Sequence, residues 1–228
     1  MRMRLLLRLR SATGRRGIRR LLLSAALLGG LLGASANPAW AALSGADKAD
    51  VARAEAYLNG ISTLQARFLQ IAPNGGASEG IAYLSRPGKL RLDYDPPVPI
   101  QIFGSENLLI YYDSKLKQVS HLPMGSTPAA FLVRPNVAFD GKDVSVTRVQ
   151  RQPGVVAITL VQSKEPAAGE MTLIFSDAPF ALRQWRVTDA QGAVTSVSLF
   201  DTRTGITFDR DLFVFRDPNF FKDNNDTR

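Results

Sequence analysis

Residues 86–97 read RPGKLRLDYDPP and contain the clearest strand pattern of the chain. From Lys89 to Tyr94, apolar and charged residues alternate strictly, which places the apolar side chains on one face of an extended segment and the charges on the other. Pro87 and Gly88 occupy the two central positions of a turn directly before it. This stretch therefore predicts a strand with one buried face that begins at a tight turn.

Short segments with strand-forming residues recur before and after this stretch, separated by turn signals. They are Thr63–Ile71, Ser78–Ser85, Ile100–Gly104, Leu108–Asp113, Gln118–Leu122, Val144–Gln152, Val155–Gln162, Glu170–Ser176, Ala181–Thr188, Val194–Thr202 and Asp211–Arg216. An open sheet with this many strands seldom stays flat. The pattern predicts a mainly β fold built on a single antiparallel sheet that curls.

Two of the segments, Leu108–Tyr112 and Val155–Val161, are apolar on both faces. Such strands are expected where both faces of a sheet are covered, or where the inner face bounds an apolar hollow. Ordinary packing of a central strand explains the pattern equally well.

Two other segments have helical signals. Ser44 followed by Asp47 resembles a capping box, and after it apolar residues recur at helical spacing, with Asn59 and Gly60 as the expected stop. The apolar positions are Val51, Ala54, Leu58 and Ile61. Residues 125–133 (GSTPAAFLV) combine a capping residue, a proline at the first helical position and an apolar body, and predict a short helix.

The positive charge of the chain is concentrated at its start. Eight arginines lie within residues 1–20, and the rest of the chain has 20 basic and 20 acidic residues, so the charge gives no argument for a nucleic-acid partner. An apolar stretch, residues 21–36, follows, and then the small residues Ala39 and Ala41. We expect residues 1–41 to be a cleaved signal peptide and residues 42–228 to be the mature domain. The arginine pairs leave the twin-arginine route open, but the general secretory route is favoured because no cofactor motif follows.

Signals for catalysis are weak. The chain has no cysteine and a single histidine, His121, which excludes thiolate metal sites and multi-histidine zinc sites, and it has no serine-nucleophile elbow or phosphate-binding glycine loop. We therefore expect no metal and no cofactor. The acid pairs Asp93/Asp95 and Asp209/Asp211 have a spacing that a glycosidase could use, so a secreted hydrolase remains a less favoured alternative.

The stretch 86–97 resembles the periplasmic outer-membrane lipoprotein carrier family, LolA. Further stretches follow in the order of that family: residues 61–70 (ISTLQARFLQ), 104–119 (GSENLLIYYDSKLKQV), Thr127-Pro128 with Phe131-Leu132, and 213–218 as a closing strand. The resemblance implies an unclosed β-barrel whose mouth is capped by helices acting as a lid. It implies a periplasmic, monomeric, non-enzymatic chaperone that carries lipoproteins from the inner to the outer membrane.

The resemblance also implies roles for individual residues. Arg86 matches the family arginine that holds the lid shut through hydrogen bonds to lid carbonyls. The expected lid residues are Val51, Leu58, Phe131 and Leu132, and the expected lining of the acyl-chain cavity is Phe68, Leu84, Leu90, Leu92, Tyr94, Ile102, Ile110 and Tyr112. At Ile110 the family more often has an aromatic residue.

The implied partners are the acyl chains of lipoproteins, an ATP-driven (ABC) release complex of the inner membrane and an outer-membrane acceptor. A carrier or sensor of another amphiphile, such as a glycolipid, is the alternative within the same fold.

Overall fold

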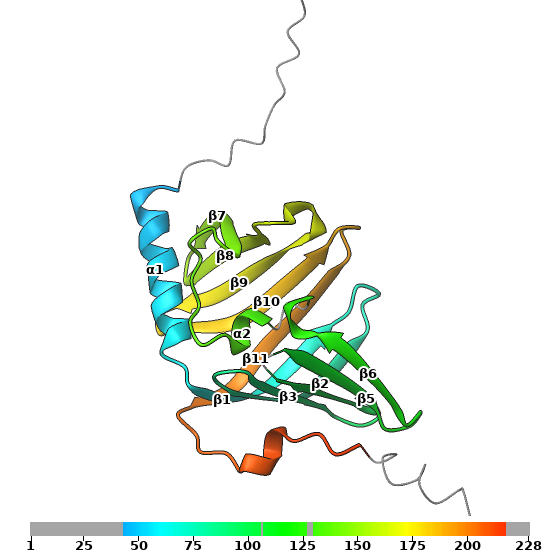
Figure 1. The fold of residues 1–228 in the computed structure, drawn as a ribbon. Coiled ribbons are helices and arrows are strands. Elements are labelled where there is room, and N and C mark those ends of the chain that lie inside the picture. Colours follow the sequence, from blue (N-terminus) through cyan, green and yellow to red (C-terminus); the bar gives the residue numbers. More distant parts are fainter. Residues whose placement is uncertain (1–42, 106, 127–129, 218–228) are drawn as a thin grey trace, which may run out of the picture. The chain divides into compact units, whose positions relative to one another are not determined.

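In the computed structural model, which describes residues 43–105, 107–126 and 130–217, eleven strands form a single antiparallel sheet (Figure 1). The strand order is β6-β5-β4-β3-β2-β1-β11-β10-β9-β8-β7, so β6 and β7 are the two edges and the sheet is not closed. The strands are β1 Thr63–Ile71, β2 Ala77–Ser85, β3 Lys89–Tyr94, β4 Ile100–Gly104, β5 Leu108–Asp113, β6 Gln118–Pro123, β7 Val144–Gln152, β8 Val155–Gln162, β9 Gly169–Asp177, β10 Phe180–Asp189 and β11 Val194–Thr204. The predicted fold class is confirmed, and all but the last predicted strand agree with these bounds to within two residues at each end.

The chain builds the sheet from two meanders of consecutive hairpins. Strands β1 to β6 form the first meander and β7 to β11 the second, and pairing between β1 and β11 joins them. The edge strands β6 and β7 are therefore consecutive in sequence. The segment that connects them contains the short helices η1 (Met124–Ser126) and α2 (Ala130–Val133), which places α2 between the two halves of the sheet (Figure 1).

One face of the sheet, which we call the inner face, carries the apolar core. Along β1, Leu64 and Phe68 are buried on this face, as the period of two requires. Helix α1 (Gly45–Asn59) and helix α2 add the buried side chains of Leu58 and Phe131. The buried residues of both meanders and both helices form one cluster.

Helix α1 begins and ends where the sequence predicts. The Ser44 hydroxyl accepts a hydrogen bond from the Asp47 amide at 3.1 Å, and the Asp47 carboxylate accepts one from the Ser44 amide at 3.0 Å, which completes the capping box. Gly60 follows the last helical residue, Asn59, and its amide donates to the Ala56 carbonyl at 3.0 Å. None of the helices in the described ranges is long and apolar enough to cross a bilayer.

The helix predicted within residues 125–133 is confirmed for its last part, Ala130–Val133. Thr127 and Pro128 lie outside the described residues, and so does the expected signal peptide, residues 1–41.

The strand predicted over Asp211–Arg216 is wrong. This segment begins with a 3-10 helix, η3 (Arg210–Phe213), capped by the Asp209 carboxylate, which accepts from the Asp211 amide at 2.8 Å. The preceding strand, β11, lies inside the sheet between β1 and β10, so no vacant strand edge is available beside it. The expected closing strand of residues 213–218 is absent from the described part, residues 213–217.

Aromatic side chains of this C-terminal segment pack on the outer face of the first meander. The Phe208 ring contacts Tyr83 edge-on at a centroid distance of 5.9 Å. The Phe215 ring lies 5.2 Å from Phe103 and 5.5 Å from Tyr112. On the outer side of β5, Phe215 therefore covers Tyr112, while on the inner side Leu109 belongs to the core.

Candidate functional site

An apolar hollow of about 70 Å³ lies between the inner face of the sheet and the helices α1 and α2, which we call the lid. Strands of both meanders and the turn after β2 contribute to its walls. The lining residues are Leu58, Ile61, Leu64, Ala82, Tyr83, Leu84, Arg86, Leu90, Leu92, Leu132, Leu182, Trp185 and Leu199.

Three of the predicted cavity residues line this hollow, namely Leu84, Leu90 and Leu92. Leu84 and Leu90 are cross-strand partners in β2 and β3, and only 5% and 4% of each residue is exposed. Leu58 of α1 and Leu132 of α2, both predicted as lid residues, line it from the helical side.

Three further predicted residues lie on the inner face beside the hollow without lining it. Ile102 is the cross-strand partner of Leu92 and packs against the core. Phe68 is fully buried, and its ring contacts Tyr94 edge-on at 5.0 Å. The Tyr94 hydroxyl donates to the Gln70 side-chain carbonyl at 2.9 Å, and burial raises the pKa of Tyr94 above its ordinary value. These residues extend the apolar face beyond the hollow.

Ile110 and Tyr112, also predicted to line the cavity, lie on the opposite face. In β5 it is Leu109 that points inward, with 7% of the residue exposed. Ile110 is the cross-strand partner of Phe103, and the Tyr112 ring is covered from outside by Phe215. Because β5 is apolar on both sides, its period of two could not decide which set faces the core.

The remaining predicted lid residues belong to the core rather than to the hollow. Val51 is half-buried on α1 and packs against the core cluster. Phe131 of α2 is buried and lines a separate pocket of about 210 Å³, together with Leu160 and Met171.

Leu182 and Trp185 of β10 line the hollow although the sequence pattern did not indicate them. Residues three apart on a regular strand point to opposite faces. Here the register with β9 shifts between Leu182 and Gln184, and this bulge turns both side chains inward. Strict alternation could not reveal such a pair.

Arg86 joins the C-terminal ends of the two lid helices. Its Nε donates to the Leu132 carbonyl of α2 at 2.7 Å, and its Nη1 donates to the Leu58 carbonyl of α1 at 2.6 Å. Carbonyls in the last turn of a helix lack helical partners, and the guanidinium provides several donors in a fixed plane. Two residues after Arg86, in the same turn, the Gly88 amide donates to the Val133 carbonyl of α2 at 2.8 Å. The turn after β2 thus donates one hydrogen bond to α1 and two to α2.

The third nitrogen of this guanidinium is in a different situation. Arg86 Nη2 is buried and has no hydrogen-bond partner among the described residues. Arg86 itself is part of the hollow's lining. Burial lowers the pKa of the Arg86 guanidinium from its ordinary value, because the charged form is removed from water.

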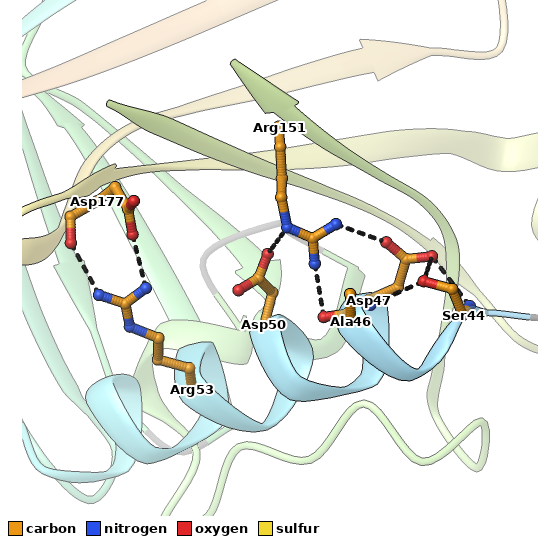
Figure 2. Close-up of polar contacts among 7 residues, drawn as sticks. All are labelled: Ser44, Ala46, Asp47, Asp50, Arg53, Arg151 and Asp177. Carbon is orange, nitrogen blue, oxygen red and sulfur yellow. Dashed lines mark hydrogen bonds and ion pairs between the residues drawn. The ribbon is translucent and has the colours of Figure 1, made fainter. Parts of the chain in front are cut away.

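The start and the middle of α1 are attached to the second meander by two arginines (Figure 2). Arg151 of β7 forms ion pairs with Asp47 at 3.0 Å and Asp50 at 2.6 Å, and it also donates to the Ala46 carbonyl at 2.5 Å. Arg53 of α1 forms an ion pair with Asp177 at 2.6 Å and donates to the backbone carbonyl of the same residue at 2.8 Å.

The second half of α1 is attached through the segment that follows α2. The Asn59 side chain donates to the Val137 carbonyl at 2.9 Å and accepts from the Val137 amide at 2.7 Å. The Glu55 carboxylate accepts from the Phe139 amide at 2.5 Å. Helix α1 is therefore bound to its surroundings along its whole length.

The acid pairs of the hydrolase alternative have structural partners. Asp93 accepts hydrogen bonds from Arg91 and Gln101, and Asp95 forms an ion pair with Arg67 at 2.7 Å. In the second pair, Asp209 caps η3 and Asp211 forms an ion pair with Arg216 at 2.8 Å.

The sole histidine, His121, is exposed on the edge strand β6. Among the described residues, no three His, Asp or Glu side chains gather into a potential metal site.

Comparison with known proteins shows to which family the chain belongs. Residues 59–216 match the family described as outer membrane lipoprotein carrier protein LolA. The chain belongs to the LolA family. The matched residues include every strand of the sheet, the second lid helix and Arg86.

Curated proteins described as outer-membrane lipoprotein carrier protein are similar to most of the chain. An outer-membrane lipoprotein carrier protein of Methylococcus capsulatus is 31% identical over 188 residues, which cover 78% of this chain and 89% of the relative. A protein of the same description from Methylobacillus flagellatus is 29% identical, with 63% and 73% covered. Among solved structures, a LolA superfamily protein from Nitrosomonas europaea aligns with a TM-score of 0.42 and 9% identity over 72% of this chain and 97% of that protein.

Proposed function

We propose that the mature chain is a periplasmic carrier that binds the acyl chains of lipoproteins beneath the lid and ferries them from the inner to the outer membrane. The observation that carries this proposal is the apolar hollow covered by two short helices, whose ends are joined by Arg86. Curated relatives described as outer-membrane lipoprotein carriers support the choice of cargo. Cargo would be received from an ATP-driven complex of the inner membrane and passed to an acceptor in the outer membrane.

The closed hollow is too small for an acyl chain. Its volume of about 70 Å³ is roughly half that of an engineered apolar protein cavity, ~150 Å³, that accepts benzene. Binding therefore requires that part of the lid moves away from the sheet. In the closed state Leu58 and Leu132 occupy the space in which the chain would lie.

The free energy needed to open the lid lowers the net affinity for acyl chains, so that bound cargo can still be released. Removing one methylene from water contributes about 0.8 kcal/mol, so a chain of about sixteen carbons would gain on the order of 12 kcal/mol. A carrier that bound several such chains without any opposing term would not release them. The free energy of breaking the Arg86 contacts and exposing the lid's apolar side offsets part of this gain and keeps release possible.

Replacement of Arg86 tests the proposal. We expect Arg86→Leu to fold cooperatively but to transfer lipoprotein to acceptor membranes at least about tenfold more slowly. Hydrogen bonds from a charged group are worth about 1.5–3 kcal/mol each, and without them the lid no longer competes with bound cargo. Transfer is measured as the amount of radiolabelled lipoprotein that moves from the purified complex into outer-membrane vesicles.

Arg91→Leu is the matched control. Arg91 also donates to a backbone carbonyl, that of Leu212 at 2.9 Å, but it does so on the outer face, away from the lid. Transfer at the wild-type rate by Arg86→Leu would remove Arg86 from the mechanism. Mass spectrometry of lipids and lipoproteins that co-purify with the native protein distinguishes lipoprotein cargo from another amphiphile.

A further inference from the structure

The unpartnered nitrogen of Arg86 is the least satisfied polar group at the site. Nε and Nη1 each donate to a lid carbonyl, whereas Nη2 is buried with no acceptor among the described residues. Native proteins seldom leave a buried donor of a charged group unpaired, because the loss of its water is then uncompensated. Such a group calls for an explanation in terms of function.

The hollow that Arg86 lines offers no side-chain acceptor to this nitrogen. The other described lining residues are aliphatic, apart from Tyr83 and Trp185. The Tyr83 ring packs against Phe208 on the outer face, and an indole N–H is only a donor. Among the described residues, Nη2 therefore has no acceptor.

When the lid opens, the Arg86 guanidinium loses acceptors that it has in the closed state. When α2 leaves the sheet, the guanidinium loses the Leu132 carbonyl, and it loses the Leu58 carbonyl if α1 also moves. A guanidinium that remains beside an apolar pocket then needs new acceptors of the same kind. An acyl chain, by its chemistry, ends in a carbonyl of an ester or an amide, which is a neutral acceptor like the backbone carbonyls it would replace.

We propose that Arg86 is the binding site for the ester or amide carbonyl at the head of the bound acyl chain. This inference rests on the proposed function. Nη2 binds the first cargo carbonyl, and the donors released by Leu132 bind further carbonyls as the lid opens. Lid and cargo thus compete for the same guanidinium. The tail lies against Leu84, Leu90 and Leu92, which line the hollow from the two strands that flank the Arg86 turn.

The test compares two synthetic diacyl lipopeptides of equal chain length, one with ester-linked chains and one with ether-linked chains that lack the carbonyls. Dissociation constants are measured from the fluorescence of Trp185, which lines the hollow and is the one tryptophan of residues 42–228. We expect the wild-type protein to bind the ester at least tenfold more tightly than the ether. In Arg86→Leu this ratio falls to about one, while Arg91→Leu keeps the wild-type ratio.

The binding measurements separate a failure of the Arg86 inference from a failure of the proposed carrier function. Equal binding of ester and ether by the wild-type protein overturns the inference and leaves the carrier function standing, and this comparison needs no variant. Absence of binding of either lipopeptide to both wild type and Arg86→Leu overturns the carrier function as well. An ester and ether pair of phosphatidylcholine identifies the source of the carbonyl: a tenfold ratio there too means that Arg86 recognises any acyl ester, and a ratio confined to the lipopeptides means that it recognises the lipoprotein head.

Discussion

Helices α1 and α2 both cover the hollow, yet they are attached to the sheet in different ways. Helix α1 has 15 residues and is bound at its start by Arg151, near its middle by Asp177 and in its second half by Val137 and Phe139. Helix α2 has four residues, and its described polar contacts to the sheet are two backbone carbonyls bound by Arg86 and Gly88. We infer that α1 is the fixed part of the lid and α2 the part that leaves the sheet when the hollow opens.

The largest expected effect is on the free energy of unfolding, when a leucine of each helix is replaced by alanine. Leu58 of α1 is 1% exposed, whereas Leu132 of α2 is only half-buried. We expect Leu58→Ala to lower the free energy of unfolding by about 3 kcal/mol and Leu132→Ala by about 1 kcal/mol, because a cavity in a packed core is filled less easily than one beneath a movable segment. Urea denaturation of the two variants measures both values. Equal losses would mean that α2 is packed as firmly as α1.

A smaller effect is expected from the arginine that binds the start of α1. We expect Arg151→Gln to lower the free energy of unfolding by about 1 kcal/mol at low ionic strength and by less in 0.5 M salt, because partly exposed ion pairs are screened. Arg148→Gln is the control, since Arg148 lies on the same strand but pairs with Glu170 instead of the helix. Urea denaturation at two salt concentrations gives the comparison. A loss that does not change with salt would show that the ion pairs to Asp47 and Asp50 do not hold the helix.

The smallest expected effect is a change with pH at the first turn of α1. Hydrogen bonds from Ser44, with a further contribution from Arg151, lower the pKa of the Asp47 carboxyl below its ordinary value of 3.8. A carboxyl whose pKa is lowered by folding stabilises the folded state above pH 3.8, and this contribution is lost as the pH falls through the folded value. We therefore expect the first turn of α1 to loosen below pH 3.8, whereas α2, which has no titratable side chain, does not respond.

The amide NMR signals of Ser44 and Asp47 follow this transition directly, because both amides take part in the capping box. In Asp47→Asn the transition should be missing from this pH range. Amide signals of Ser44 and Asp47 that show no transition at any pH below 3.8 would contradict the assignment.

Local sequence patterns predicted most of the fold because they follow from local chemistry. The capping box of Ser44 and Asp47 and the alternation from Lys89 to Tyr94 depend on near neighbours in the chain, and the structure confirms both elements. Alternation also predicted that Leu90 and Leu92 share a face, and both line the hollow.

The sequence could not predict features that depend on distant parts of the chain. The prediction that Ile110 and Tyr112 of β5 face inward was wrong, because the outer side of this strand is apolar too. Phe215, about a hundred positions later in the chain, packs on Tyr112 from that side. Leu182 and Trp185 are three residues apart, a spacing that predicts opposite faces of a regular strand. The sequence therefore did not indicate the bulge in β10 that brings them together. The family resemblance singled out Arg86, but only the coordinates show which carbonyls it contacts and that Nη2 has no partner in the described chain.

The pairing of β1 with β11 has a consequence for how the hollow comes into being. These two strands lie near opposite ends of the folded chain, and each contributes a wall of the hollow, Leu64 from one and Leu199 from the other. The hairpins of each meander close short loops, whereas this seam must close the longest one, so it is expected to form late in folding. A chain that lacks its last strands cannot enclose the hollow, which therefore appears only when all eleven strands of the sheet are paired.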